Sequence, residues 1–264
     1  MSQRKYFEKI LKKFGMENCK PRKSPCEEGI DKESDDSSLL DDPSVYREIV
    51  GSLIYAMTAT RPDLSYVVTK ISQKMSKPSM QDMSVAKGVL RYLQGSLDHT
   101  LVFRKSKEIV HIQGYCDSDW ASSYSDRRSI SGYVYKLNKD SGFVSWRSKK
   151  QNVVALSSCE AEYIALATCV QEALYLLKLF TFMYDVKNGE ANVTIGVDNQ
   201  GTIALAKNPV HQQRSKHIDV RYHFLRDVVA EGIVKLYYVP TSVNVADVLT
   251  KPVSGRKMVN LLGY

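Results

Sequence analysis

Four carboxylates occupy positions where an apolar side chain would stabilise the fold more, and these residues could carry chemistry. Asp117 and Asp198 each end a stretch with the pattern of a buried strand, and Asp247 opens a short helical stretch. Glu162 shares the apolar stripe of a long helical stretch, so its side chain is expected to point toward the core. A buried carboxylate is costly unless it is paired, hydrogen-bonded or bound to a metal. We therefore expect each of these acids to have such a partner.

Carboxylates that lie close together need a cation between them. Like charges about 4 Å apart repel by roughly 1 to 4 kcal/mol at high to moderate dielectric constants. Oxygen ligands without histidine or cysteine suit Mg²⁺ or Mn²⁺. Two such ions about 4 Å apart could activate water on one side of a phosphodiester and stabilise the leaving oxygen on the other. The acids thus predict a metal site for phosphodiester hydrolysis.

Structural roles compete with this interpretation. Glu160 has capping-box spacing after a serine, and we predict a capping role for it. Asp198 and Asp247 each stand before or at the start of a helical stretch, where an N-cap is the alternative. The pair Asp119 and Trp120 is expected to shape the exit of the first strand. Glu162 has no comparable structural explanation.

The elements that must position these acids follow from hydrophobic periodicity. A helical period over 46–95 is interrupted at Pro62 and Pro78. From 109 onward the period changes to two, and later segments alternate helix with strand. The expected strands are 109–117, 129–138, 142–148, 191–198 and 233–240, and the expected helices among them are 157–180, 199–208, 215–232 and 245–251.

This order predicts an α/β fold, a mixed five-stranded sheet flanked by helices and preceded by a smaller, mainly helical region. The first and fourth strands are then neighbours and the first long helix packs across them, so the acids should converge. The expected domains are a basic amphipathic segment at 1–24, an acidic flexible linker at 25–44, a helical connection region at 45–105 and the α/β domain at 106–264.

Composition favours a polyanionic partner in a reducing compartment. The formal net charge is +8 and the sequence pI is about 9.1. The five cysteines lack zinc-ligand spacing and leave one unpaired under any disulfide scheme, which favours an intracellular location, in the cytoplasm or nucleus. The opening stretch is basic and amphipathic and lacks a long apolar core, so we do not expect it to be a signal peptide. Lys178 interrupts the longest apolar run, so we expect no membrane partner.

Five sequence blocks follow one another over about 114–252. They read "GYCDSDWASSYSDRRSISGYVY", "SWRSKKQNVVALSSCEAEYIAL", "VDNQGTIALAKNP", "RSKHIDVRYHFLRD" and "VNVADVLTKP". Together they resemble successive blocks of the ribonuclease H domain of copia-type retrotransposon Pol polyproteins. The stretches "YREIVGSLIYAMTATRPDLSYVV" and "AKGVLRYLQGSLDHTLVF" resemble the segment that follows the reverse transcriptase palm in those polyproteins.

The resemblance implies a ribonuclease H-like fold and a metal-dependent endonuclease that hydrolyses the RNA strand of RNA–DNA hybrids. Its catalytic, metal-binding set would be Asp117, Glu162, Asp198 and Asp247, with two Mg²⁺ or Mn²⁺ ions as cofactor. The reverse transcriptase part of the same polyprotein is the expected protein partner. This chain has no "YxDD" polymerase motif, so DNA synthesis by it alone is not expected.

Basic and amide side chains near these acids are the expected substrate contacts, with a solvated basic loop as the alternative. The residues expected to meet phosphates are Arg147, Lys149, Lys150 and Gln151, together with Arg214 and Lys216. Asn199 and Gln200 adjoin Asp198 and could read a 2′-hydroxyl. Many relatives carry a catalytic histidine before the last helix, but "PTSVNVA" has none. His217 is the substitute candidate, with a structural or substrate-contact role as the alternative.

Two other functions remain open at this point. One is a catalytically silent nucleic-acid-binding fragment or domesticated remnant of the element, which the intact set of acids disfavours. The other is a related integrase or resolvase that acts on duplex DNA, which the "ADVLTK" block and the lack of a zinc motif disfavour.

Overall fold

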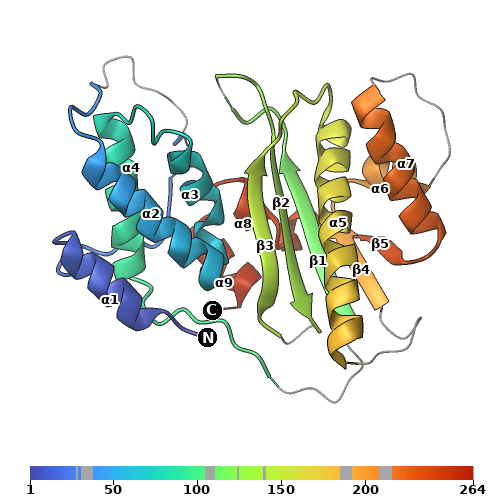
Figure 1. The fold of residues 1–264 in the computed structure, drawn as a ribbon, viewed down its shortest axis with the longest axis horizontal. Coiled ribbons are helices and arrows are strands. Elements are labelled where there is room, and N and C mark those ends of the chain that lie inside the picture. Colours follow the sequence, from blue (N-terminus) through green and yellow to red (C-terminus); the bar gives the residue numbers. More distant parts are fainter. Residues whose placement is uncertain are drawn as a thin grey trace. The chain divides into compact units, whose positions relative to one another are not determined.

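A computed structural model describes residues 1–27, 29–30, 38–104, 111–123, 125–138, 141–184, 192–207 and 216–263, with the backbone alone for 192 and 216–222. The chain forms two compact units, Met1–Leu101 with Lys251–Tyr264, and Val102–Thr250 (Figure 1). Residues 251–264 thus group with the first unit, although the sequence assigns them to the α/β domain. The linker expected at 25–44 lies partly outside the described residues, at 28 and 31–37.

The first unit is helical. Proline punctuates it as expected, because the 3₁₀ helix η1 begins at Pro62 and Pro78 precedes the capping box of Ser79 and Asp82 at the start of α4. Its elements are α1 (Arg4–Lys13), α2 (Ser44–Ala59), η1 (Pro62–Leu64), α3 (Ser65–Ser72), α4 (Met80–Gln94) and α9 (Gly255–Leu262).

A buried ion pair joins η1 to α4 in this unit. Arg61 Nη2 lies 2.7 Å from Asp63 Oδ2, and both side chains are fully buried. Tyr92 donates its hydroxyl to the same carboxylate oxygen at 2.7 Å, and Arg61 Nη1 donates to the Ser96 carbonyl at 3.1 Å. Because every charge here has a partner, removal of one member would leave the other buried and uncompensated.

The second unit is built on a mixed five-stranded sheet with strand order β3-β2-β1-β4-β5. Its first three strands form an antiparallel meander, and β4 and β5 add in parallel to β1. The strands are β1 (His111–Asp119), β2 (Ile130–Leu137), β3 (Phe143–Lys150), β4 (Asn192–Val197) and β5 (Val234–Tyr238). This topology confirms the expected fold class. It corrects one detail, since β1 continues past Asp117 to Asp119, where it still pairs with Ile130.

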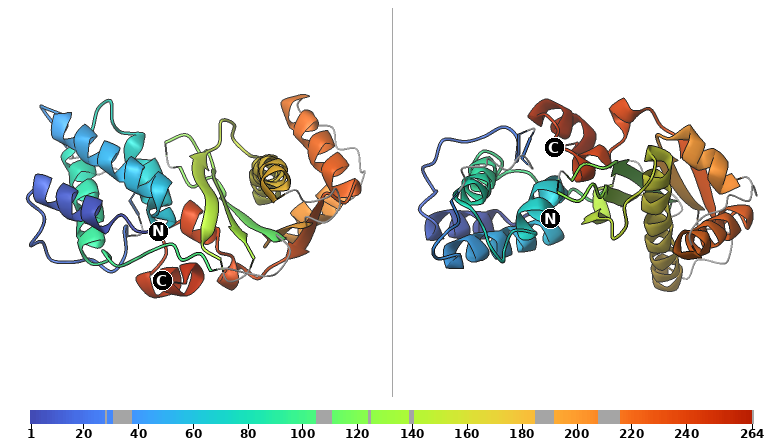
Figure 2. Two further views of the ribbon diagram at one scale, coloured as in Figure 1. Left: turned by 60° about the horizontal axis from the view of Figure 1, so that its bottom comes forward. Right: turned by 90° about the horizontal axis from the view of Figure 1, so that it is seen from above.

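Helices cover the sheet from both faces. The helices of this unit are α5 (Ser158–Tyr184), α6 (Gln200–Lys207), α7 (Lys216–Ala230), the 3₁₀ helix η2 (Thr241–Val243) and the short α8 (Asp247–Thr250). Figure 1 shows α5 lying along β1, and Figure 2 shows α7 on the same side of the sheet. On the opposite face α8 packs so closely that a Cβ at Gly132 would lie 2.7 Å from Thr250 Cγ2.

The core between α5 and the sheet explains the apolar character of α5. Gly114 leaves room for the Tyr135 ring, whose hydroxyl donates to the Cys169 carbonyl at 2.7 Å. By length and composition α5 could cross a bilayer, yet half of its most apolar window is buried inside the fold. The buried apolar residues of α5 therefore have a structural explanation in the core of this unit.

Candidate active site

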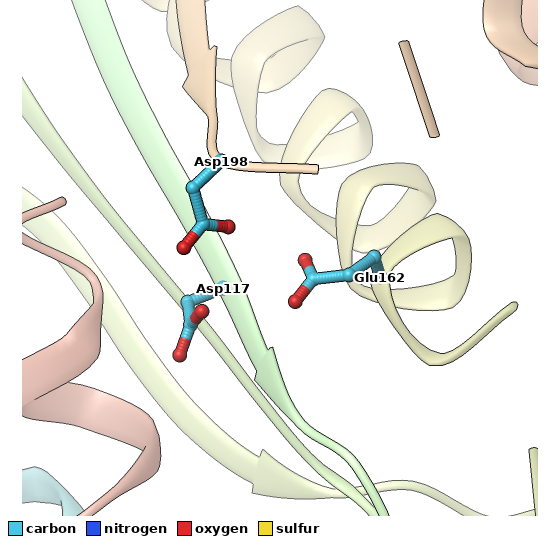
Figure 3. A group of neighbouring side chains, drawn as sticks. All are labelled: Asp117, Glu162 and Asp198. Atoms are coloured by element: carbon cyan, nitrogen blue, oxygen red, sulfur yellow. The ribbon is translucent and has the colours of Figure 1, made fainter. Parts of the chain in front are cut away.

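Three of the four predicted acids converge at the carboxyl ends of β1 and β4. One oxygen each of Asp117, Glu162 and Asp198 lies within 4.8 Å of the other two. Figure 3 shows Glu162 from α5 and Asp198 from the end of β4 pointing toward Asp117 on β1. Asp117 and Glu162 are 2% and 6% exposed, whereas Asp198 is half-buried. The cluster is thus closed on two sides and open beside Asp198.

The parallel register of β1 and β4 accounts for this convergence. Tyr115 pairs with Gly196, so continuation of the register by two residues places Asp117 beside Asp198. Neighbouring strands lie about 4.8 Å apart, which keeps the two carboxylates close. Glu162 arrives from the second turn of α5, the helix that packs on β1.

A separate hydrogen bond holds each carboxylate. Thr250 donates its hydroxyl to Asp117 Oδ2, and the Ser118 amide donates to Glu162 Oε1 at 3.1 Å. Thr241 donates its hydroxyl to Asp198 Oδ2 at 2.8 Å. These donors fix the orientation of the acids before any ligand binds.

The acids also affect the pKa of Cys116, the residue that precedes Asp117 on β1. The pKa of the Cys116 thiol lies well above its ordinary value because of its hydrogen bond with Cys169, burial, and the charges of Cys169, Glu162 and Asp117. Cys116 is thus a neutral side chain under the site rather than a thiolate ligand. The donor set is made of carboxylate oxygens, which is the chemistry that Mg²⁺ and Mn²⁺ prefer.

Asp247 is fully buried at the first residue of α8 and is not a member of the converging group. Its helix nevertheless reaches the site, since Thr250 on the same helix binds Asp117. Asn244 anchors this helix, because its Nδ2 donates to the Cys116 carbonyl at 3.0 Å and its Oδ1 accepts from the Ala246 amide at 3.1 Å. A metal-binding role for Asp247 stays a prediction.

The capping alternative for Asp198 is wrong, because its neighbour performs that role. Asn199 Oδ1 accepts a hydrogen bond from the Thr202 amide at 3.0 Å, three residues into the turn that begins α6. Asp198 therefore does not cap α6, and its side chain faces the other acids. Gln200 is exposed at the first residue of α6. Contact of Asn199 or Gln200 with a 2′-hydroxyl stays a prediction.

The cations predicted to contact substrate differ in their surroundings. Arg147 and Lys149 are exposed on β3, whereas Lys150 Nζ lies 2.9 Å from Asp126 Oδ1. Gln151 is buried and donates to Ser131 Oγ at 2.9 Å and to the Ala161 carbonyl at 3.0 Å, so the expectation that it meets phosphates is wrong.

The last group of predicted contacts falls at the edge of the described chain. Arg214 lies outside the described residues. Lys216 and His217 belong to α7, but their side chains are also outside the described part. Their roles stay predictions.

The start of α5 bears out the distinction between Glu160 and Glu162. Ser157 Oγ accepts from the Glu160 amide at 3.2 Å, and Glu160 Oε2 accepts from the Leu156 amide at 2.9 Å. Glu160 is thus engaged at the helix start, as predicted, although its carboxylate accepts from the Leu156 amide and not from the Ser157 amide that a capping box would use. Trp120 Nε1 donates to the Ala155 carbonyl at 3.0 Å and so links the exit of β1 to the connection between β3 and α5.

Comparison with known proteins places the chain among retroelement sequences. No protein-family model matches it. It is 35% identical over 268 aligned residues to the retrovirus-related Pol polyprotein from transposon TNT 1-94 of Nicotiana tabacum, an alignment that covers 97% of this chain and 19% of that protein. It is 39% identical to the corresponding polyprotein from transposon RE2 of Arabidopsis thaliana, over 96% of this chain and 17% of that protein. The chain spans less than a fifth of the length of these relatives.

Among solved structures, the chain is similar to a foamy viral protease-reverse transcriptase determined in complex with double-stranded DNA. The TM-score is 0.50 at 9% identity, and the alignment covers 80% of this chain and 40% of that one. At this identity the likeness concerns the fold alone.

Proposed function

We propose that this chain, which belongs to the retrovirus-related Pol polyproteins of copia-type transposons, carries an active ribonuclease H domain. This domain would be a divalent-metal-dependent endonuclease that cleaves the RNA strand of RNA–DNA hybrids. The observation that carries the proposal is the convergence of Asp117, Glu162 and Asp198 within 4.8 Å. Acids so close together are destabilising in a metal-free protein, so their arrangement calls for a functional explanation.

The residues present fit a hard divalent cation. Asp117, Glu162 and Asp198 would hold it through carboxylate oxygens, and the resemblance adds Asp247 as a further ligand. Bound Mg²⁺ or Mn²⁺ would supply the Lewis acidity that activates water for attack on a phosphodiester.

The chain itself supplies orientation and access. Thr250, Thr241 and the Ser118 amide each bind one oxygen of an acid and so orient the three carboxylates. The half-buried Asp198 marks the side from which a phosphodiester would enter. Arg147 and Lys149 are the exposed cations best suited to hold phosphates of the bound strand.

Strand choice would rest on sugar chemistry. Asn199 keeps its amide nitrogen as a donor although its oxygen caps α6, and the exposed Gln200 offers both a donor and an acceptor. A 2′-hydroxyl, present only in RNA, is the group such side chains can read. His217 would serve the leaving group or the substrate backbone. The reverse transcriptase part of the polyprotein would be the partner that produces the hybrid.

A cleavage assay tests this proposal. The full chain is incubated with end-labelled RNA–DNA hybrid, RNA duplex or DNA duplex, each with Mg²⁺ and with chelator. We expect cleavage of the RNA in the hybrid with Mg²⁺ alone, and its loss in Asp117→Asn but not in Asp126→Asn, a carboxylate that pairs with Lys150. Equal cleavage of all three duplexes would refute the assigned substrate. Absence of cleavage under every condition would favour a silent nucleic-acid-binding remnant.

A further inference from the structure

An exposed apolar group lies at the exit of β1, beside the acid cluster. Trp120 is 47% exposed although it immediately follows a central strand, and Val154 and Leu156 are 49% and 85% exposed in the connection between β3 and α5. Apolar side chains exposed in a group usually mark a contact surface. We call Trp120, Val154 and Leu156 the Trp120 platform.

The platform is held rigidly. Trp120 Nε1 donates to the Ala155 carbonyl at 3.0 Å, and Ala155 itself is buried in a small cluster with Ala161 and Ile164. The neighbours of Ala155 on both sides, Val154 and Leu156, consequently turn outward. An indole fixed by its N–H loses little rotational freedom when a ligand stacks on it.

Basic side chains lie in the loop between β1 and β2 and at the end of β3. Asp119, Ile130 and Lys150 are aligned across β1, β2 and β3, so the loop after Trp120 and the end of β3 lie side by side. Two of the cations there are compensated, because Lys150 Nζ lies 2.9 Å and Arg128 Nε 3.5 Å from the Asp126 carboxylate.

Two further cations of this region remain available. Arg127 and Lys149 are exposed and form no ion pair within the described chain. Arg127 is also held at a φ of +55°, a conformation that costs energy for a residue with a side chain and that tends to persist at functional positions. Exposed cations at the same end of the sheet as an exposed aromatic ring match a single-stranded nucleic acid, which offers phosphates and base faces together.

We propose that Trp120 stacks on an unpaired or terminal base of the nucleic acid bound at the acid cluster, with Arg127 and Lys149 on the adjoining phosphates. Inside a duplex both faces of a base are covered by its neighbours, and stacking there would cost a few kcal/mol for unstacking a base step. An unpaired or terminal base can stack on a side chain without this cost. Trp120 lies three residues from Asp117, at most about 11 Å along the strand. That distance is about three nucleotide steps.

This inference rests on the proposed function and names its preferred substrate. The enzyme would favour hybrids with an end or a single-stranded tail close to the cleavage point over the interior of a long hybrid. The test therefore separates binding, measured without metal, from cleavage.

Tryptophan fluorescence gives a direct readout, because the chain has two tryptophans, Trp120 and Trp146. The full chain carrying Trp146→Phe is titrated in chelator with a single-stranded oligouridylate of about 12 nucleotides, within the usual site size. We expect saturable quenching of Trp120. Binding of the same, fluorescein-labelled oligonucleotide is then compared between the parent and its variants.

Trp120→Ala is expected to weaken binding of the oligonucleotide roughly 5- to 150-fold, the effect of removing one stacking aromatic side chain. Trp120→Phe keeps a ring but loses the N–H that binds Ala155, and it should retain most of the affinity. Tyr175→Ala is the matched control, because Tyr175 is 60% exposed on α5 about 20 Å beyond Glu162, and it should bind as the parent does. Arg127→Gln and Lys149→Gln should each reduce the salt dependence by about 0.7 in slope.

Three outcomes overturn the inference. Equal affinity of Trp120→Ala and the parent would mean that the platform receives no nucleic acid, as expected if a protein docks there. A Trp120→Phe variant as weak as Trp120→Ala would assign the effect to the hydrogen bond with Ala155, hence to loop position. Quenching that does not saturate would exclude a defined site. Failure of the proposed function is distinguishable, since it would abolish Mg²⁺-dependent cleavage while Trp120-dependent binding in chelator persisted.

Discussion

Conversion of Asp198 to Asn should stabilise the metal-free protein, because it removes one charge from three that repel. The two other acids have oxygens within 4.8 Å of it. At that separation each like-charge pair costs about 0.9 kcal/mol in water and about 3.5 kcal/mol at an effective dielectric constant of 20. Since Asp198 is half-buried on the open side of the cluster, we expect the lower range, about 1 to 2 kcal/mol for both pairs together.

The substitution is close to isosteric and keeps the hydrogen bond from Thr241, because the Asn amide oxygen can accept it. In chelator Asp198→Asn should therefore melt about 2 to 8 °C above the parent, at about 2 to 4 °C per kcal/mol for a domain of this size. Mg²⁺ should reverse the order. At 100 times its Kd, a ligand of the folded state stabilises it by about 2.7 kcal/mol, and the variant with one ligand fewer gains less.

Thermal unfolding followed by circular dichroism gives the melting temperatures of the parent and of Asp198→Asn, each in chelator and in Mg²⁺. Asp126→Asn is the control. Its carboxylate forms an ion pair with Lys150 in the same unit, so its loss should lower the melting temperature equally with and without metal. A parent insensitive to Mg²⁺, or an Asp198→Asn variant that melts lower in chelator, would refute the shared cation site.

Other substitutions probe the parts of the structure that support the site. Glu162→Gln should abolish hybrid cleavage, whereas Glu160→Gln should keep most of it and cost about 1 kcal/mol as a weakened helix start; equal losses in a cleavage assay would contradict the assignment of the two glutamates. Thr250→Val should weaken Mg²⁺ binding about 10- to 100-fold in calorimetry, while Thr250→Ser should not, and identical affinities would exclude an orienting role. Arg61→Ala should lower the free energy of unfolding of the helical unit by about 3 to 5 kcal/mol in urea, because it leaves the buried Asp63 carboxylate without its counter-charge. A decrease below about 1 kcal/mol would show that water replaces the guanidinium.

Periodicity and the resemblance together were enough to predict the sheet and the converging acids. Alternation placed Asp117 on a strand, and the apolar stripe around Glu162 identified a carboxylate that faces the core. Their meeting with Asp198 follows from strand order alone, because parallel neighbours bring their carboxyl ends together. These inferences succeed since each depends on backbone period and topology rather than on individual side-chain contacts.

The partners of the acids could not be predicted in the same way. Thr250 in α8 and Asn244, which lies shortly before α8, reach β1 from more than a hundred residues later in the chain, and nothing local distinguishes them from other polar residues. Whether Asp198 or Asn199 caps α6 depends on a single residue of register. Gln151 looks like part of a basic loop, yet it is buried between β2 and α5.

The parallel pairing of β1 with β4 also determines when the site can exist. The meander of β1, β2 and β3 has short connections and can pair while later residues are still being synthesised, but α5 and its connections must be complete before β4 can reach β1. Until then the inner edge of β1 exposes unpaired backbone groups, the usual starting point for aggregation. A product that terminates between β3 and β4 would therefore lack Asp198 and also carry an open sheet edge. We expect such truncated products to be insoluble rather than partially active.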